Sequence, residues 1–250
     1  MKYNETLYPM DIGSNVIVEI GEGCFCNAAF NIRNNVNLII GKSCTLFGKM
    51  ILMDYADMCV NEGCYLKGKI FLRSKAALRI GKECAIRANT MDIRDETNCF
   101  IGNNVTTGEN FLASVSDYTS LQIGDDCMFS HEVAIYTNDG HGIFDVELGE
   151  NINSTPEENA SRKVVIGNHV WIGFRTMILY KTVIGDGSII GAYSLVKNKF
   201  PNNCMAVGIP AKDIRHNISW SRVSGSNDIA SCGMEYVNMT SVLYHSHFTK

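Results

Sequence analysis

The sequence is poor in proline, in charged residues and in long apolar runs. Of 250 residues, only 4 are proline and 19% are charged, and the formal net charge is -4. A general nucleic-acid-binding protein carries a surplus of basic residues, so the composition disfavours that class. No apolar run approaches the ~18 residues of a membrane span, and the N-terminal residues lack the apolar core of a signal peptide. We therefore expect a soluble, cytoplasmic protein.

The ten cysteines occur without a single CxxC pair. Structural zinc sites normally use such close pairs, and disulfides belong to secreted chains, so neither is expected here. With 46% hydrophobic residues the chain can bury a large core. We interpret the cysteines as reduced thiols inside that core.

One pattern recurs along the first half of the chain. It consists of an aliphatic residue, glycine or asparagine, two variable residues and a cysteine, and it steps by 20 residues three times running. It reads Ile20-Gly21-Glu22-Gly23-Cys24, Ile40-Gly41-Lys42-Ser43-Cys44, Val60-Asn61-Glu62-Gly63-Cys64 and Ile80-Gly81-Lys82-Glu83-Cys84. The pattern continues at Ile101 and Ile123, where the step is slightly longer than 20 residues. Self-similarity at a fixed period indicates a repeat architecture.

Each repeat contains a shorter period of six. Apolar residues recur at Ile20, Cys26 and Ile32, and every sixth position from Ile166 to Val196 is aliphatic. Six matches neither the 3.6 period of an α-helix nor the period of two of one strand. It fits a three-sided coil with one inward position per face, and one enlarged corner extends the turn to 20 residues.

The glycines that follow the inward aliphatic residues are expected at the corners. Such turns often need positive φ, which glycine tolerates best and asparagine next best. Gly41 and Gly81 represent this position, and Asn61 replaces glycine in the third repeat. Between coils, we expect Ile to stack on Ile and Cys on Cys at ~4.8 Å.

These motifs resemble the hexapeptide-repeat acyltransferases, especially bacterial capsular and surface-polysaccharide O-acetyltransferases. The most specific stretch contains Val170-Trp171-Ile172-Gly173 and Gly208-Ile209-Pro210-Ala211-Lys212. The resemblance implies an all-β, left-handed parallel β-helix. We expect an N-terminal cap at residues 1–11, the β-helix at 12–215 with an inserted loop at 136–163, and a C-terminal extension at 216–250.

The repeat is interrupted once, between Ile135 and Ile166. Insertions in repeat proteins often lie on the binding face. Here the insertion contains Thr137-Asn138-Asp139-Gly140-His141, which matches the Thr-x-Asp-x-His setting of the general base in the resembled enzymes. Imidazole has a pKa of ~6.5, which suits proton removal from an acceptor hydroxyl near neutral pH. Asp139 is the candidate to orient the imidazole; Asp145 and a purely local turn role for Asp139 remain open.

Trp171 is one of two tryptophans and falls between inward positions Ile166 and Ile172. We expect Trp171 to lie beside the loop. The resemblance implies a place at the thioester, where its indole N–H would donate to the developing oxyanion. Core or subunit packing is the alternative. His131 is expected at the cleft rim and His169 at a solvated corner. Their spacing from His141 does not fit a His₃ zinc site, and no metal is expected.

Acetyl-CoA is the co-substrate that the resemblance implies, bound between neighbouring β-helices of a homotrimer. The C-terminal coils carry basic residues that can neutralise its phosphates, and an ordinary solvated basic patch is the alternative for them: Lys197, Lys199, Lys212 and Arg215. The candidate donor-binding residues are Gly140, Gly173, Phe174, Arg175, Ala192, Lys197, Lys212 and Arg215.

The predicted function is acetyl transfer from acetyl-CoA to a sugar hydroxyl of a surface polysaccharide or its precursor. The alternatives are N-acetylation of an aminosugar, acetylation of an antibiotic, and a β-helical scaffold without catalysis. The sequence does not name the acceptor sugar.

Overall fold

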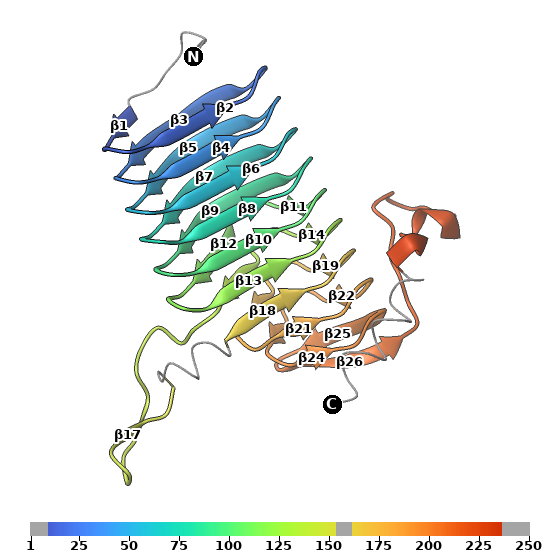
Figure 1. Cartoon of the computed structure of the whole chain (residues 1–250). Coiled ribbons are helices and arrows are strands. Elements are labelled where there is room, and N and C mark those ends of the chain that lie inside the picture. Colours follow the sequence, from blue (N-terminus) through green and yellow to red (C-terminus); the bar gives the residue numbers. More distant parts are fainter. Residues whose placement is uncertain (1–9, 154–161, 237–250) are drawn as a thin grey trace.

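A computed structural model describes residues 10–153 and 162–236. The chain winds into a long rod of stacked coils, with the N-terminal and C-terminal coils at opposite ends (Figure 1). Nearly all the strands pair in parallel, and the helical residues that the structure describes are few: the short 3₁₀ turn η1 (Ile229–Ser231) and residues 234–236. The predicted all-β parallel β-helix is confirmed. No helix of the described residues is long and apolar enough to cross a membrane.

One side of the rod is a nine-stranded parallel sheet with one strand per coil, which we call the third face. Its strands are β2 (Ile17–Ile20), β4 (Asn37–Ile40), β6 (Asp57–Val60), β8 (Ala77–Ile80), β10 (Asn98–Ile101), β13 (Ser120–Ile123), β18 (Lys163–Ile166), β21 (Val183–Ile184) and β24 (Lys199–Phe200).

The other two sides share one sheet, because the early coils cross both faces with a single long strand. These long strands are β3 (Phe25–Ile32), β5 (Thr45–Leu52), β7 (Tyr65–Leu72) and β9 (Ala85–Ile93). Later coils split, with the first face formed by β11 (Thr106–Thr107), β14 (Met128–Phe129), β19 (Trp171–Ile172), β22 (Ile189–Ile190) and β25 (Cys204–Gly208). The second face contains β12 (Phe111–Val115), β15 (Ala134–Tyr136), β20 (Met177–Ile178) and β23 (Leu195–Val196).

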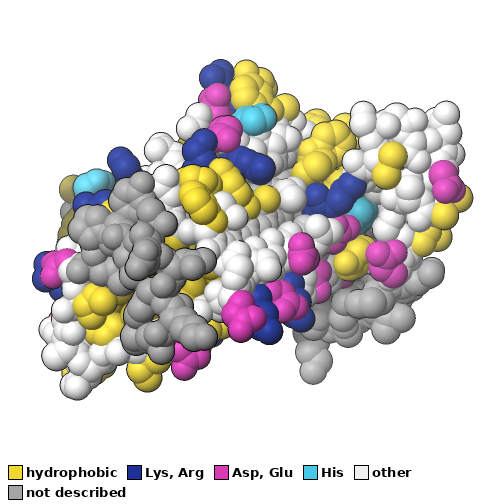
Figure 2. Space-filling model, turned by 90° about the horizontal axis from the view of Figure 1, so that it is seen from above, with side chains coloured by type: hydrophobic (Ala, Val, Ile, Leu, Met, Phe, Trp, Pro, Cys, Tyr) yellow, Lys and Arg dark blue, Asp and Glu magenta, His cyan; other side chains and the backbone are white. Residues whose placement is uncertain are grey.

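Different elements cover the two ends. At the start, β1 (Met10–Ile12) pairs with the second half of β3, and residues 1–9 of the expected cap lie outside the described residues. At the other end, β26 (Ala211–His216) runs antiparallel to β25 along the edge of the first face. Seen from above in Figure 2, basic, acidic and hydrophobic side chains are interspersed, in keeping with the small net charge.

The core forms as columns of like residues, as the repeat predicted. In the third face, the inward residue at each strand end pairs with its counterpart in the next coil. This column contains Ile20, Ile40, Val60, Ile80, Ile101, Ile123, Ile166, Ile184 and Phe200. Because each coil covers the apolar face of the last, only the terminal coils need separate cover.

The repeated cysteines line the corner that follows the third face, which we call the cysteine corner (residues 41–44 in the second coil). Each thiol donates a hydrogen bond to a carbonyl of the next coil: Cys44 to Asn61 at 3.1 Å, and Cys64 to Gly81 at 3.0 Å. No disulfide is present; all ten cysteines are free. Burial raises the pKa of Cys99 and of Cys127 to about 12, so both stay neutral thiols. The predicted column of reduced thiols is confirmed.

The conformational reason given above for the corner glycines is wrong. Gly41 has no positive φ; the left-handed residue is Ser43, two positions later, with φ 54°. Gly41 is needed because a Cβ there would lie 2.5 Å from the backbone nitrogen of Glu62 in the next coil. Asn61 likewise is not left-handed, and its neighbour Gly63 is, with φ 73°. Close stacking of coils therefore selects the first glycine, and turn conformation selects the third residue of the corner.

This distinction predicts opposite behaviour for two substitutions in one corner. Gly41→Ala should lower the free energy of unfolding by about 1–3 kcal/mol, because the added methyl group meets backbone. Ser43→Gly should change it by less than about 1 kcal/mol, since relief of left-handed strain is offset by greater freedom of the unfolded chain. Urea unfolding followed by circular dichroism measures both; equal losses would contradict this assignment.

Candidate active site

The chain leaves the coil after β15 ends at Tyr136 and returns at β18. The exit lies at the corner between the second and third faces, which we call the loop corner. Within the loop, β16 (Phe144–Asp145) and β17 (Glu150–Asn151) form an antiparallel hairpin that projects away from the rod (Figure 1). The carboxylate of Asp145 accepts hydrogen bonds from the backbone of Glu147 and Leu148, both at 2.9 Å. Asp145 therefore shapes the hairpin turn.

A polar cluster around the buried side chains of Asn153 and Arg162 holds the base of the loop. The side-chain amide of Asn153 donates to the Asp139 carboxylate at 3.0 Å and to the carbonyl of His141 at 2.9 Å. The Arg162 guanidinium, 1% exposed, lies 3.4 Å from Asp139 and over the ring of Tyr180. Burial raises the pKa of Tyr180, and the negative charge of Asp139 raises it further. Asp139 thus has a structural role at the loop base, and its predicted role on the imidazole stays a prediction.

His141 itself is exposed, between Gly140 and Gly142. Gly140 has φ 83°, and a Cβ there would meet nothing within 4 Å. The backbone around the histidine is nevertheless fixed, because Asn153 also accepts a hydrogen bond from the Ile143 nitrogen at 2.6 Å. The imidazole is therefore presented to solvent from an anchored segment. Sequence reasoning missed Asn153 and Arg162, although Arg162 directly precedes the residue where the repeat resumes.

Trp171 occupies the outer side of the first face. Its side chain is 36% exposed, so it is not a core residue, and its indole nitrogen donates to the Ser130 hydroxyl at 3.4 Å. This hydrogen bond is long, so the N–H could be given up to a stronger acceptor. The expectation that Trp171 lies beside the loop is wrong for a single chain, because the loop leaves the corner opposite the first face.

Four of the predicted donor-binding residues come together at the corner between the first and second faces. Gly173 is buried, and the position requires glycine because a Cβ there would lie 2.5 Å from the nitrogen of Ala192. The Arg175 guanidinium is held by Glu132 at 2.6 Å and lies 5.0 Å from the centre of the Phe174 ring. Arg175 and Ala192 are exposed. The corner thus offers backbone, an aromatic ring and a positioned cation.

The remaining predicted donor-binding residues lie elsewhere. Lys212 and Arg215 lie on β26, exposed along the edge of the first face. Lys197 follows β23 on the far side of the coil, at the loop corner, and Gly140 belongs to the loop. The structure does not gather these residues into one basic patch within a single chain.

The other two histidines have structural partners. His131 is exposed, and its Nδ1 accepts a hydrogen bond from the backbone nitrogen of Glu109 at 2.9 Å. The expectation that His169 is solvated is wrong: it is 2% exposed. Its ring is stacked between Trp220, at 4.2 Å, and Tyr236, at 5.3 Å. The C-terminal segment supplies both partner rings, which the sequence pattern could not place.

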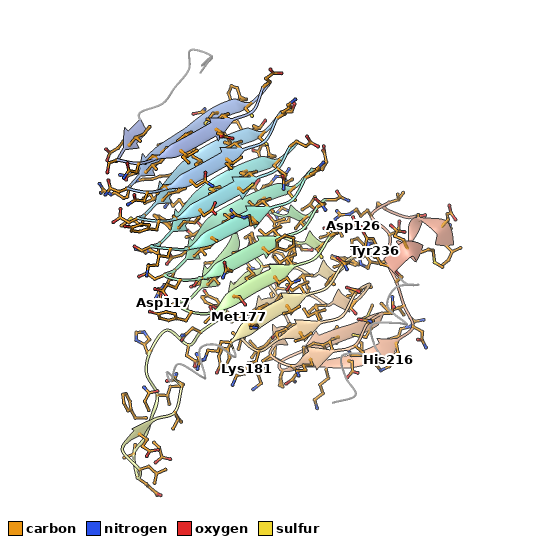
Figure 3. All side chains as sticks on the ribbon, viewed as in Figure 1. Asp117, Asp126, Met177, Lys181, His216 and Tyr236 are labelled. Carbon is orange, nitrogen blue, oxygen red and sulfur yellow. The ribbon has the colours of Figure 1, made fainter. Side chains whose placement is uncertain are left out.

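This C-terminal segment docks on the cysteine corner through one carboxylate. Asp126 contacts His169 Nδ1 at 2.6 Å and Arg222 Nε at 2.5 Å, and Figure 3 shows it beside Tyr236. Burial opposes ionisation of Asp126, but the hydrogen bonds from His169 and Arg222 outweigh it and keep its pKa below the usual range. The Trp220 ring also lies 6.1 Å from that of Trp171. The docked segment therefore packs next to Trp171, one of the candidate site residues.

Comparison with known proteins agrees with this architecture. The family described as bacterial transferase hexapeptide (six repeats) matches residues 163–198. A polysialic acid O-acetyltransferase of Escherichia coli O1:K1 / APEC is 31% identical over 56% of this chain and 44% of its own. A galactoside O-acetyltransferase of E. coli K12 is 38% identical over 46% of this chain and 55% of its own. The chain thus spans about half the length of these relatives.

The crystal structure of the polySia-specific acetyltransferase NeuO is similar over 93% of this chain and 98% of the NeuO chain, with a TM-score of 0.62 and 26% identity. The whole rod, and not only the matched repeats, therefore has a counterpart. Residues 163–198 thus match the hexapeptide-repeat transferase family, and the rod as a whole has the fold of an acetyltransferase that resembles it.

The Asp126 contacts predict how docking of the C-terminal segment depends on pH. A carboxylate with a lowered folded pKa contributes stability that is present above its unfolded pKa of ~3.9 and is lost as the pH falls through the folded value. Tryptophan fluorescence should therefore report a docked segment at pH 5 and release only below about pH 4. Asp126→Asn should remove this acid transition; an unchanged transition in that variant would refute the assignment.

Proposed function

We propose that this protein is an O-acetyltransferase that moves an acetyl group from acetyl-CoA to a sugar hydroxyl of a surface polysaccharide or its precursor, in the cytoplasm. The observation that carries the proposal is His141, exposed on an anchored loop of a hexapeptide-repeat β-helix. The relatives named as O-acetyltransferases of polysialic acid and of galactosides support a carbohydrate acceptor.

Bound acetyl-CoA supplies the activated acetyl group. The protein's part is to remove a proton from the acceptor hydroxyl, which becomes nucleophilic as an imidazole nitrogen of His141 takes that proton. The Trp171 N–H then stabilises the charge that develops on the carbonyl oxygen. As the C–S bond breaks, the imidazolium returns the proton to the leaving thiolate, so the base is regenerated. The transfer is direct, without an acetylated enzyme.

The corner formed by Gly173, Phe174, Arg175 and Ala192 suits a donor that combines amides with charge. The exposed Ala192 offers backbone at the surface, and Arg175 supplies a guanidinium already oriented by Glu132. Lys212 and Arg215, exposed on β26, can neutralise phosphate groups. Lys197 and Gly140 lie at the loop corner and would reach a donor bound by a neighbouring chain.

The divided site requires more than one chain. His141 lies on the loop that leaves the rod at the corner opposite the face that bears Trp171. The base and the oxyanion donor therefore meet only where two rods lie side by side. The hairpin also exposes apolar side chains, with Val146 94% and Leu148 70% exposed. Such side chains favour burial against a neighbour. A homotrimer closes this contact symmetrically and gives a site at each interface.

Acetyl transfer is tested by incubating the full chain with acetyl-CoA and a panel of acceptors, then detecting products by mass spectrometry. The panel contains an acidic polysaccharide, a galactoside, an aminosugar and an aminoglycoside. An acetyl ester on a sugar hydroxyl is the expected product. An acetamide on the amine acceptors alone would replace the proposal by N-acetylation, and no product from any acceptor would reject it.

His141→Ala should lower kcat by ~10²- to 10⁴-fold while acetyl-CoA binding persists, because only proton removal is lost. Trp171→Ala should cost less, since it removes one oxyanion donor. His131→Ala is the matched control and should keep most turnover, because its ring serves the backbone of Glu109. Steady-state kinetics and calorimetry of donor binding measure these effects. Loss of turnover in His131→Ala with near-normal His141→Ala would overturn the assignment.

Replacing the exposed apolar pair of the hairpin should weaken assembly. The double substitution Val146→Asp/Leu148→Asp introduces charge where a neighbouring chain must bury methyl groups, so light scattering should report a smaller particle than the trimeric parent. Glu147→Gln, on the same turn, should leave the mass unchanged. A monomeric parent protein at working concentration would rule out the shared site.

A further inference from the structure

The early coils carry a ladder of aromatic side chains on the outer side of the first face. The rings of Phe25 and Phe47 lie 5.6 Å apart, and those of Phe47 and Tyr65 lie 5.7 Å apart. Phe25 is 55% exposed, whereas the core lies on the opposite side of these strands. Phe47 and Tyr65 are half-buried, and the Arg87 guanidinium lies 5.2 Å from the centre of the Tyr65 ring. The exposed parts of these three rings offer apolar surface to which the C–H faces of sugar rings can bind.

Two lysines lie just past this ladder, beyond Gly48 and Gly68, where the long strands pass onto the second face. Lys49 and Lys69 are directly paired in register on β5 and β7, so their backbones are about 4.8 Å apart. Both are exposed, and no ion pair of either is found in the part of the chain that the structure describes. Like charges at this spacing repel each other, so the pair favours an anionic partner.

Lys67 and Arg87 add positive charge to the same strip. They share one carboxylate, that of Glu109, at 3.1 and 3.9 Å. Lys67 and Arg87 thus share one acidic side chain on the first face, and Lys49 and Lys69 add two cations on the adjoining second face, although the chain as a whole has a net charge of -4. The surface strip formed by the ladder and these four cations therefore has a positive net charge, whereas the protein as a whole has a negative one.

The ladder is continuous with the candidate active site. Tyr65 pairs in register with Ala85, then Thr106, Met128 and finally Trp171, all outward positions of the first face. Four coil steps span about 19 Å. The intervening side chains are small or unbranched, and Arg222 of the C-terminal segment donates a hydrogen bond to the Thr106 hydroxyl at 3.0 Å. An extended chain that lies along this file from the ladder to Trp171 therefore meets a further cation at its midpoint.

We propose that Phe25, Phe47, Tyr65, Lys49 and Lys69 form an acceptor track that binds an acidic polysaccharide chain and leads it to the active site. The aromatic rings contact the apolar faces of the sugars, and the lysines contact their carboxylates. The inference rests on the proposed function and adds the charge and the polymeric nature of the acceptor. A track of this length favours polymers over short oligosaccharides.

Direct binding tests the track independently of catalysis. Fluorescently labelled polysialic acid is titrated with the full chain, and anisotropy is followed at low salt and in about 0.5 M salt. Lys49→Glu/Lys69→Glu should weaken binding about tenfold at low salt and much less at high salt. Arg33→Glu, an exposed charge reversal at the loop corner, is the matched control and should have little effect.

A second pair of variants tests the aromatic ladder. Phe47→Ala should weaken polymer binding about threefold or more, because apolar contact area is lost. Phe100→Ala, which removes a ring that is 48% exposed on the third face, should not. With a sialic acid trimer as acceptor, all these variants should retain the parental kcat and KM, because the oligomer is too short to reach the track.

The outcomes separate the track from the proposed function. Binding that is lost in the lysine variant, without acetyl transfer by the parent, would support the track and reject the transferase. Normal transfer with equal polymer binding by the lysine and Arg33→Glu variants would reject the track alone. A change of mass in the lysine or Phe47→Ala variants, seen by light scattering, would identify the strip as a subunit contact and overturn the proposal. Neutral dextran binding as tightly as polysialic acid would overturn its acidic specificity.

Discussion

The distance between neighbouring parallel strands governs every part of this molecule. Backbone hydrogen bonds hold successive coils about 4.8 Å apart, so any group that recurs in the repeat meets its own copy at that distance. Thiols therefore meet backbone carbonyls of the next coil, as at Cys44 and Asn61. The same spacing excludes a Cβ at Gly41. It also produces ladders of side-chain acceptors, as where Asp125 accepts from the backbone of Asn103 at 2.6 Å.

The candidate site shows how a rigid rod can carry chemistry that its core does not need. Trp171 and Arg175 are placed by the coil itself, and their positions follow from register and corner geometry. His141 is placed by an excursion whose base is fixed by Asn153 and Arg162. One half of the site is thus as rigid as the β-helix, and the other half is held by a small buried polar cluster. Neither half depends on replacing a residue of the buried columns.

Much of this arrangement could be predicted from the sequence, because equivalent residues of successive repeats make equivalent contacts. The columns of Ile40 and Cys44, the three faces and the single interruption all follow from periodicity. The role of Gly41 could not, since a close approach and a left-handed turn both favour glycine and only coordinates separate them. The burial of His169 was also beyond reach, because Trp220 and Tyr236 lie outside the repeat. For the same reason the partners of Asp139 were missed: they belong to the loop, which has no period.

The uniform 20-residue register of the early coils has a consequence for how such a protein can change. From β3 to β7 every residue pairs with the one 20 positions later, so removal or duplication of one such unit would leave each neighbour facing an equivalent surface. The rod could lengthen or shorten by whole coils while Trp171, the loop and the C-terminal segment kept their mutual geometry. Reach along the first face would then be a property that varies in discrete steps, independently of the chemistry at the other end.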